Sequence, residues 1–274
     1  MKVDRTYRDN IRLVVFDWAG TTVDFGCQAP ILAFIEGFKA KGIEVSARTA
    51  RGPMGMEKRA HIKAVTEVSD VAEAWHQRYG RAVTEEDIDE MFNDFVPHLL
   101  TILDSHSQII PGVIEAVTSL RESGVLIGST TGYFREAADI VAAAGARAGY
   151  VADYSVCASD VEEGRPYPWM IYRVMEALNI CPPEAVVSVG DTEVDMKAGL
   201  NGGVWSIGVA ATGNEMGLDR EAFDQLDSGE RESQLTKVRE RLYAAGAHLV
   251  IDTMEELPAA VKKINVLLAS GDKP

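Results

Sequence analysis

The chain has 274 residues, of which 46% are hydrophobic, so it is long enough to bury the core of one large domain or of two ordinary ones. It contains 27 lysines and arginines against 42 aspartates and glutamates, which gives a formal net charge of −15. A chain this acidic repels a phosphate backbone, so its composition argues against nucleic acid as a partner. An anionic substrate would need a metal ion or a few well-placed cations to offset the same charge.

The cysteines and the first residues indicate where the protein functions. Cys27, Cys157 and Cys181 are scattered, without the spacing of a zinc site, which is typical of a reducing cytoplasm. Residues 1–10 are charged and contain no apolar segment, unlike a signal peptide. No apolar run has the length of a membrane span. We therefore expect a cytoplasmic protein without a membrane partner.

The first predicted element is a strand at residues 13–16, a short apolar run that is typical of a buried strand in a parallel sheet. The run ends at Asp17, and Gly20, Thr21 and Thr22 follow. Ligands of open α/β sheets bind where strands end in this way, so the carboxylate of Asp17 would lie at the mouth of a crevice. On this stretch alone, an aspartate that caps or turns the chain is an equally good interpretation.

The next region, residues 27–103, contains only predicted helices. Their apolar spacing and end signals place them at 28–41, 45–52, 56–68, 70–79 and 84–103. Thr84 has the character of an N-cap, with acidic residues in the first turn after it. Because the region contains no plausible strand, we expect an inserted, all-helical domain above the carboxyl edge of a sheet.

Strands and helices alternate through the rest of the chain. The predicted strands are 125–129, 154–158, 185–189, 204–209 and 248–251, and the predicted helices are 111–123, 134–144, 168–178, 195–201, 231–244 and 254–268. This alternation implies an α/β fold with a doubly wound, mostly parallel sheet. The predicted domains are an α/β core of residues 1–26 and 104–274, and the helical domain of residues 27–103.

Polar residues follow four of the predicted strands and would meet at one edge of the sheet. Asp17 follows the first strand and Arg165 the third, while Asp191 follows the fourth, with Asp195 four residues later. The second strand leads into a hydroxyl-rich segment with a glycine, a combination that suits an oxyanion: Ser129, Thr130, Thr131 and Gly132. Taken singly, each is ordinary, and Asp191 reads as a helix N-cap.

Together these residues predict a phosphoryl-transfer site. Clustered carboxylates repel one another unless a cation joins them, and oxygen ligands without histidine or cysteine indicate Mg²⁺. A metal, a hydroxyl, an arginine and a carboxylate that is free to attack are the parts needed for an aspartyl-phosphate intermediate.

In this order, the four stretches resemble the four motifs of the haloacid dehalogenase superfamily, and the helical insertion resembles its cap domain. The resemblance implies a haloacid dehalogenase-like, Rossmann-type core. The roles that it implies are the nucleophile for Asp17, phosphoryl binding for Thr131, the third-motif cation for Arg165, Mg²⁺ ligation by Asp17, Asp191 and the carbonyl of Ala19, and support of the metal site by Asp195.

Ala19 departs from the pattern of this superfamily. Its phosphatases usually carry a second aspartate at that position, which protonates the leaving oxygen as a general acid. Alanine cannot do this, which leaves three interpretations: the leaving group does not need that proton, another group supplies it, or the protein is inactive. A carbon leaving group that is stabilised in another way fits the first.

The helical insertion contains a candidate for that other stabilisation. Lys58 and His61 lie one helical turn apart, just after the glycine- and proline-containing segment 52–55. Most lysines on a helix are solvated, and a histidine beside one is usually incidental. A lysine with a lowered pKa near an active site can instead form a Schiff base with an aldehyde. The positive end of the helix dipole is expected to lower the pKa of Lys58.

Four segments resemble the phosphonatase family within this superfamily: Asp-Trp-Ala-Gly-Thr-Thr-Val-Asp (17–24), Pro-Met-Gly-x-x-Lys-x-x-His (53–61), Gly-Ser-Thr-Thr-Gly-Tyr (128–133) and Gly-Arg-Pro-Tyr-Pro-Trp-Met (164–170). The likeness extends over nearly the whole chain, including Gly-Ala-His-Leu-Val-Ile-Asp (246–252). It implies Mg²⁺-dependent hydrolysis of the carbon–phosphorus bond of phosphonoacetaldehyde, a small-molecule phosphonate, to acetaldehyde and phosphate. The aldehyde would be held on Lys58 as a Schiff base while Asp17 attacks phosphorus, and the carbon would leave as an enamine.

The same resemblance extends to other residues of the insertion and to the assembly. It implies that Met54 faces the substrate, that His61 tunes Lys58 or relays protons, and that the protein is a homodimer. The other nearby cations, Arg59 and Lys63, do not occupy the motif position. We assign no role to Cys27 or Tyr133, although both lie near the site in sequence.

Two alternatives stay open on the sequence. Another enzyme of the same fold, either an O-phosphatase or a hydrolase of a different phosphonate, would keep activity on phosphate monoesters when Lys58 is replaced by alanine. A catalytically silent binding or regulatory protein would neither bind Mg²⁺ nor form an aspartyl-phosphate, although the presence of all four motifs argues against it.

Overall fold

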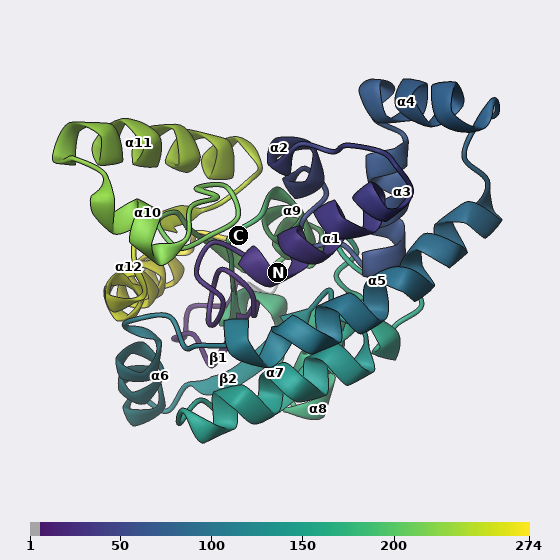
Figure 1. Ribbon diagram of the computed structural model, residues 1–274. Coiled ribbons are helices and arrows are strands. Elements are labelled where there is room, and N and C mark those ends of the chain that lie inside the picture. The colour runs from purple at the N-terminus through teal and green to yellow at the C-terminus, as the bar shows by residue number, and fades with distance from the viewer. Residues whose placement is uncertain (1–5) are drawn as a thin grey trace.

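The computed structural model describes residues 6–274, and at its centre lies one sheet of parallel strands (Figure 1). The strand order is β3-β2-β1-β4-β5-β6. The strands are β1 (Leu13–Phe16), β2 (Leu126–Thr131), β3 (Tyr154–Cys157), β4 (Val186–Gly190), β5 (Trp205–Val209) and β6 (Leu249–Ile251). The predicted α/β fold with a doubly wound parallel sheet is therefore confirmed.

β1 lies in the middle of the sheet, between β2 and β4. Phe16, its last residue, pairs with Ser129 of β2 and with Val189 of β4. Because parallel strands end at the same edge, this register brings the segments after β1, β2 and β4 together. The backbone N–H of Asp17 continues the pairing by donating to the carbonyl of Val189 at 2.9 Å.

Helices cover both faces of the sheet: α6 (Val113–Glu122), α7 (Arg135–Arg147), α8 (Trp169–Ala177), α9 (Glu193–Asn201), α10 (Arg220–Gln225), α11 (Ser228–Ala244) and α12 (Leu257–Ser270). The side chains of β1 alternate between these faces, as the pleat of a strand requires. Leu13 and Val15 belong to a hydrophobic cluster with Val174 of α8. Val14 and Phe16 belong to the cluster on the other face. All four residues of β1 are buried, which explains its continuous apolar sequence.

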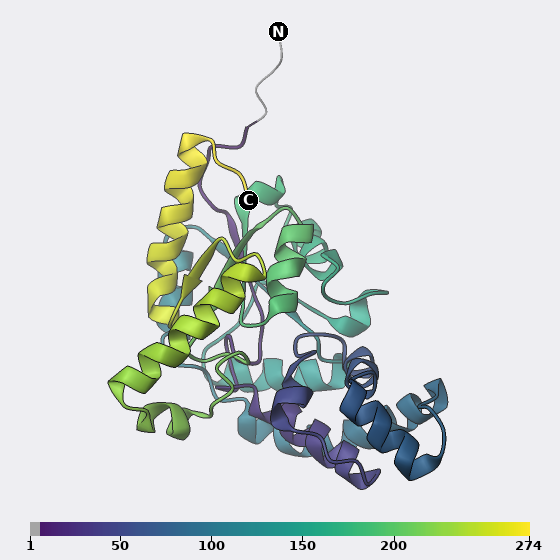
Figure 2. The same ribbon diagram turned by 90° about the horizontal axis from the view of Figure 1, so that it is seen from above.

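The helices between β1 and α6 form what we call the helical insert: α1 (Gln28–Ala40), α2 (Ala47–Arg51), α3 (Lys58–Thr66), α4 (Ser69–Tyr79) and α5 (Glu85–His106). Figure 2 shows the purple and blue helices gathered on one side of the molecule, away from α12. Thr84 caps α5 through a reciprocal pair of hydrogen bonds with Asp87. α5 also reaches the core, where Phe92 packs edge-on against Phe134. The division of the chain into two domains stays a prediction.

Several helix ends differ from those predicted. α7 continues to Arg147 instead of stopping before Gly145, because this glycine packs against Trp18 and Tyr150; a Cβ there would lie 3.4 Å from both side chains. α9 begins at Glu193 because Thr192, rather than Asp191, is its N-cap. α11 begins at Ser228, where Asp227 caps it, and the short α10 before it was not predicted.

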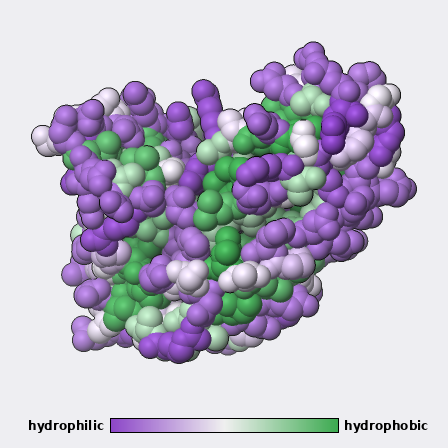
Figure 3. Space-filling model, in the orientation of Figure 1, coloured by the Kyte–Doolittle hydropathy of each residue, from purple (hydrophilic) through white to green (hydrophobic). Residues whose placement is uncertain are grey.

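Hydrophilic residues cover most of the outline of the molecule in the view of Figure 3, and apolar residues gather toward its middle. Across residues 6–274, no helix combines the length and the apolar character needed to cross a membrane. The prediction that residues 1–10 are not a signal peptide falls in part on residues 1–5, which lie outside the described residues.

Candidate active site

Asp17 and Arg165 form a buried ion pair at the carboxyl end of β1. Nη1 of Arg165 lies 2.7 Å from Oδ1 of Asp17 and 2.9 Å from Oδ1 of Asp195. Nη2 of the same guanidinium donates to Oγ1 of Thr130 at 2.7 Å and to the carbonyl of Thr130 at 3.0 Å. The predicted third-motif cation is therefore fixed by β2 on one side and by two carboxylates on the other.

Three carboxylates meet beside this arginine. Asp17, Asp191 and Asp195 each place an oxygen within 4.8 Å of the others, and all three are buried. Burial raises the pKa of Asp17 to about 6, although the positive charge of Arg165 opposes the shift. Burial and the charge of Asp17 raise the pKa of Asp191 well above its usual value. A hard divalent cation would offset this crowded charge, so the donor set fits a metal such as Mg²⁺.

Asp191 is held by residues that the sequence did not single out as ligand supports. Thr21 donates its hydroxyl to Oδ1 of Asp191 at 2.8 Å, and the backbone N–H of Asn214 donates to Oδ2 at 2.7 Å. The thiol of Cys27 lies 3.4 Å from the same Oδ2. Asn214 comes from the loop after β5, so only the folded sheet brings it to Asp191. A threonine four residues after the first aspartate was visible in the sequence, but nothing in it indicated this contact.

A small cavity lies between the core and the helical insert. Its lining residues are Asp17, Ala19, Thr131, Gly132, Tyr133, Arg165 and Thr192 from the core, and Pro30, Met54, Gly55 and Lys58 from the insert. Its volume is near 20 Å³. A cavity of this size has room for about one water molecule. The residues predicted to act as nucleophile, phosphoryl-binding threonine, third-motif cation and Schiff-base lysine thus line one cavity.

Lys58 is buried in this space, with 4% of its surface exposed. Its Nζ lies 4.9 Å from the ring centroid of Tyr133 and 5.9 Å from that of Phe34. Burial lowers the pKa of Lys58 to about 8, against the opposing charge of Asp17. The pKa of Lys58 is therefore lowered, as predicted, but the largest cause is burial and not the helix dipole. The helix start that was expected to act is itself capped by the carboxylate of Glu57.

His61 lies behind Lys58 and does not line the cavity. Its ring stacks on Phe34 at 3.8 Å, and its Nε2 lies 2.7 Å from the carbonyl of Ala50. Because a carbonyl only accepts, Nε2 carries the hydrogen, and Nδ1 has no hydrogen-bond partner in the described part of the chain. Burial lowers the pKa of His61 to about 3, so the ring is neutral. Its predicted role as a proton relay or tuning group stays a prediction.

The hydroxyl-rich end of β2 contains two kinds of residue. The hydroxyl of Ser129 lies 2.7 Å from that of Tyr150, and Thr130 orients Arg165, so these two do not reach the cavity wall. Thr131 lines the cavity, and its Oγ1 accepts the N–H of Tyr133 at 3.2 Å, which leaves its own hydrogen free to donate. Substrate contacts of Ser129 and Thr130 stay predictions that this geometry does not favour.

Gly132, Gly55 and Met56 form a close contact between the core and the insert beside the cavity. A Cβ at Gly132 would lie 2.5 Å from the carbonyl oxygen of Met56. A Cβ at Gly55 would lie 2.6 Å from Oγ1 of Thr192. The predicted substrate-binding residue Gly132 thus has a second reason to be glycine, because a side chain there would push the insert away from the core.

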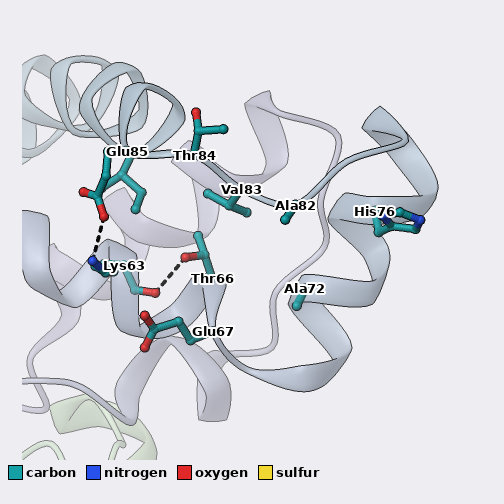
Figure 4. A pocket seen from close by; sticks show the side chains of 10 residues that line it. Lys63, Thr66, Glu67, Ala72, His76, Ala82, Val83, Thr84 and Glu85 are labelled. Atoms are coloured by element: carbon teal, nitrogen blue, oxygen red, sulfur yellow. Dashed lines mark hydrogen bonds and ion pairs between the residues drawn. The ribbon is translucent and has the colours of Figure 1, made fainter.

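A second cavity, near 310 Å³, lies within the insert among α3, α4 and α5 (Figure 4). Lys63 lines it and binds Glu85 at 2.6 Å. Arg59 binds the same Glu85 at 2.8 Å and Asp89 at 2.6 Å. The cavity contains none of the predicted site residues, and these ion pairs hold both alternative cations at the surface of the insert.

Comparisons with known proteins give one consistent result. The sequence profile of a family described as haloacid dehalogenase-like hydrolase matches residues 11–203. A phosphonoacetaldehyde hydrolase of Syntrophobacter fumaroxidans is 40% identical over 271 residues, which cover 99% of this chain and 98% of that protein. The crystal structure of a phosphonoacetaldehyde hydrolase like protein from Oleispira antarctica matches with a TM-score of 0.98 and 39% identity, covering 100% of this chain and 99% of that one.

One relative is much longer than this chain. A bifunctional phosphonoacetaldehyde hydrolase/aminoethylphosphonate transaminase of Clostridioides difficile is 44% identical over 260 residues. The match covers 95% of this chain and 41% of that protein. The chain therefore spans less than half the length of the bifunctional relative, and nearly the full length of the other two.

Proposed function

The chain belongs to the phosphonoacetaldehyde hydrolases within the haloacid dehalogenase-like hydrolase family, and we propose that it hydrolyses the carbon–phosphorus bond of phosphonoacetaldehyde through a Schiff base on Lys58 and an aspartyl-phosphate on Asp17. The observation that carries the mechanism is the shared cavity. Lys58 and Asp17 both line it, although they come from the helical insert and from the core.

The first step forms the imine. The unprotonated amine of Lys58 adds to the aldehyde carbon, and water leaves, so that the substrate carbon is joined to Nζ. A pKa of about 8 supports this role, because a useful fraction of Lys58 is neutral near pH 7. The protonated imine then acts as an electron sink for the carbon next to phosphorus.

The second step transfers the phosphoryl group. A carboxylate oxygen of Asp17 attacks phosphorus, the phosphorus–carbon bond breaks, and its electron pair moves toward the imine nitrogen to give an enamine. Arg165 and Thr131 line the same cavity as Asp17, which supports a role for both as hydrogen-bond donors to the phosphonate oxygens. Because the enamine is a stable leaving group, the general acid that is missing at Ala19 is not needed.

Protonation of the enamine carbon and hydrolysis of the imine release acetaldehyde and regenerate Lys58. Water attacks the aspartyl-phosphate, releases phosphate and regenerates Asp17. The groups proposed to hold Mg²⁺ are Asp17, Asp191 and the Ala19 carbonyl, with Asp195 in support; the bound ion would supply positive charge against these carboxylates and the phosphonate. Arg165 holds Asp17 and Asp195 at a fixed separation meanwhile.

The test is a product assay on phosphonoacetaldehyde, with acetaldehyde and phosphate measured separately, with Mg²⁺ and with excess chelator. Equal amounts of both products, formed only with the metal, are expected. A phosphate monoester is the matched control substrate. Hydrolysis of the ester that survives Lys58→Ala, without cleavage of phosphonoacetaldehyde, would replace this proposal by an O-phosphatase. Absence of Mg²⁺ binding and of an aspartyl-phosphate would indicate a silent binding protein.

We extend the proposal to a cytoplasmic homodimer that binds neither nucleic acid nor a membrane. All three cysteines are free in the structure, which suits a reducing compartment. The homodimer rests on the family resemblance. Light scattering after size-exclusion chromatography tests it, and a monomer at micromolar concentration would contradict it.

A further inference from the structure

Asn214 connects the helical insert with a carboxylate of the proposed metal site. Its side chain faces the insert, where Oδ1 accepts from Nη1 of Arg51 at 3.2 Å and Nδ2 donates to the carbonyl of Arg51 at 3.2 Å. Its backbone N–H points the other way and donates to Oδ2 of Asp191 at 2.7 Å. Asn214 is 4% exposed, so both sets of contacts are shielded from water.

Arg51 also binds the linker that leads from the core into the insert. Its Nη1 donates to the carbonyl of Gly26 at 2.7 Å. The linker lies beside the chain that returns from the insert, since Val23 forms an antiparallel bridge with Ile109. Arg51 is the last residue of α2, directly before the segment that carries Met54 into the cavity. A change in the position of the insert relative to the core would therefore move Arg51.

The loop that carries Asn214 is packed tightly on both sides. A Cβ at Gly213 would lie 2.4 Å from Cβ of Asp191. A Cβ at Gly217 would lie 3.2 Å from Nε of Arg51. The two glycines thus allow this loop to touch the carboxylate of Asp191 and the side chain of Arg51 at once. Because the packing is tight, a displacement of Arg51 would also displace the part of the loop that touches Asp191.

Substrate entry requires such a displacement. The cavity of about 20 Å³ is smaller than phosphonoacetaldehyde, because it has room for about one water molecule. The segment 52–56 and α3 must therefore move away from the core to admit substrate. Arg51 adjoins that segment, so this movement strains or breaks its contacts with Asn214.

We propose that Arg51 and Asn214 are positioning residues that couple closure of the helical insert to the orientation of Asp191. When the insert is closed, Arg51 holds the side chain of Asn214 and thereby its N–H against Asp191. Coupling between two equilibria is reciprocal, so metal binding favours closure as much as closure favours metal binding. The inference rests on the proposed metal site.

The experiment is calorimetric titration of Mg²⁺ into the full chain without substrate. It compares wild type, Asn214→Ala, Arg51→Met and the double variant. Asn214→Ala keeps the backbone N–H that reaches Asp191, so a change in affinity must come through the lost side chain. Each single variant is expected to bind Mg²⁺ about fivefold to tenfold more weakly, the lower part of the usual coupling range. The double variant should bind no more weakly than the weaker single one, because the two residues act through one contact.

Arg48→Met is the matched control. Arg48 lies on the same helix, is exposed, and has neither an ion pair nor a hydrogen bond with the residues that the structure describes. Its replacement should leave Mg²⁺ affinity unchanged. Unchanged affinity in both test variants, or additive losses in the double variant, would overturn the coupling while the metal site stands. If wild type binds no Mg²⁺, the proposed metal site fails and the coupling fails with it.

Hydrogen exchange supplies a second readout that does not depend on the metal. In Arg51→Met the amide of Asn214 should exchange faster than in wild type, whereas Arg48→Met should not change it. Arg51→Lys serves the same comparison if Arg51→Met does not fold, because lysine keeps the charge but not the guanidinium geometry. Equal exchange in the arginine variant and wild type would count against the coupling.

Discussion

Arg165 and Asp17 form an ion pair at the end of the central strand, with Nη1 of the arginine 2.7 Å from Oδ1 of the aspartate. The pair is buried, with Arg165 and Asp17 each 6% exposed. Burial alone would favour the protonated carboxyl, and the arginine opposes this shift. The proposed nucleophile is thus kept close to its charged, reactive form although it is buried.

Replacing Asp17 by asparagine should remove turnover without unfolding the protein. The amide has nearly the same shape as the carboxylate but is a poor nucleophile, so kcat should fall by about 10³-fold or more. Phosphate release measures the loss, and circular dichroism melting checks the fold. Substantial cleavage of phosphonoacetaldehyde by this variant would rule out Asp17 as the nucleophile.

Replacing Arg165 by methionine should destabilise the protein, because Asp17 and Asp195 would lose the cation that they share. Loss of one partner from a buried ion pair costs about 3–5 kcal/mol. Urea unfolding in the presence of a chelator measures the change in the free energy of unfolding.

Arg220→Met is the control for this prediction. Arg220 binds Asp224 at 2.9 Å, but both side chains are more than half exposed. Such a pair contributes about 0.5 kcal/mol or less. A loss from Arg165→Met that is no larger than the loss from the control would show that Arg165 does not hold the carboxylates in place.

The fold was predictable because its signals are local. A continuous apolar run predicted β1 with the bounds that the structure has, since a strand buried on both faces leaves no polar position. The convergence of Asp17, Arg165 and Asp191 followed from one rule, that parallel strands end at a common edge. The predicted helix end before Gly145 was wrong, because a glycine can be needed for close packing inside a helix as well as at a helix end.

The parts of the site that the sequence did not reveal depend on long-range packing. Asn214 reaches Asp191 only because β5 lies next to β4, and nothing near Asn214 in the chain indicates this contact. The largest cause of the lowered pKa of Lys58 is burial between the insert and the core, which no local pattern encodes. Tyr133 lies under Lys58 for the same reason.

The rate of imine formation should depend on pH through Lys58. Burial lowers the pKa of Lys58 to about 8, and only the neutral amine attacks the aldehyde. The neutral fraction falls about tenfold for each pH unit below the pKa, so the rate should rise from pH 6 to 8 and level off above that. Borohydride trapping at short times, with the adduct measured by mass spectrometry, follows this rate. A rise that continues to about pH 10.5 would mean that Lys58 has an ordinary pKa.

The most specific prediction compares two lysines of the same helix. Lys58 and Lys63 both lie on α3, but Lys58 is buried in the cavity whereas Lys63 binds Glu85 at the surface. Lys58→Arg keeps the positive charge but cannot form an imine, so cleavage of phosphonoacetaldehyde should fall by about 10³-fold or more. Lys63→Arg keeps a cation beside Glu85 and should leave kcat within about twofold of wild type, because surface ion pairs contribute little. Borohydride added during turnover should place the reduced adduct on Lys58 alone in both wild type and Lys63→Arg. An adduct on Lys63, or near-normal cleavage by Lys58→Arg, would show that the imine on Lys58 is not part of the reaction. Near-normal cleavage without an adduct on any lysine would leave the helical insert with no chemical role, and its contact with the core would then serve only to exclude water.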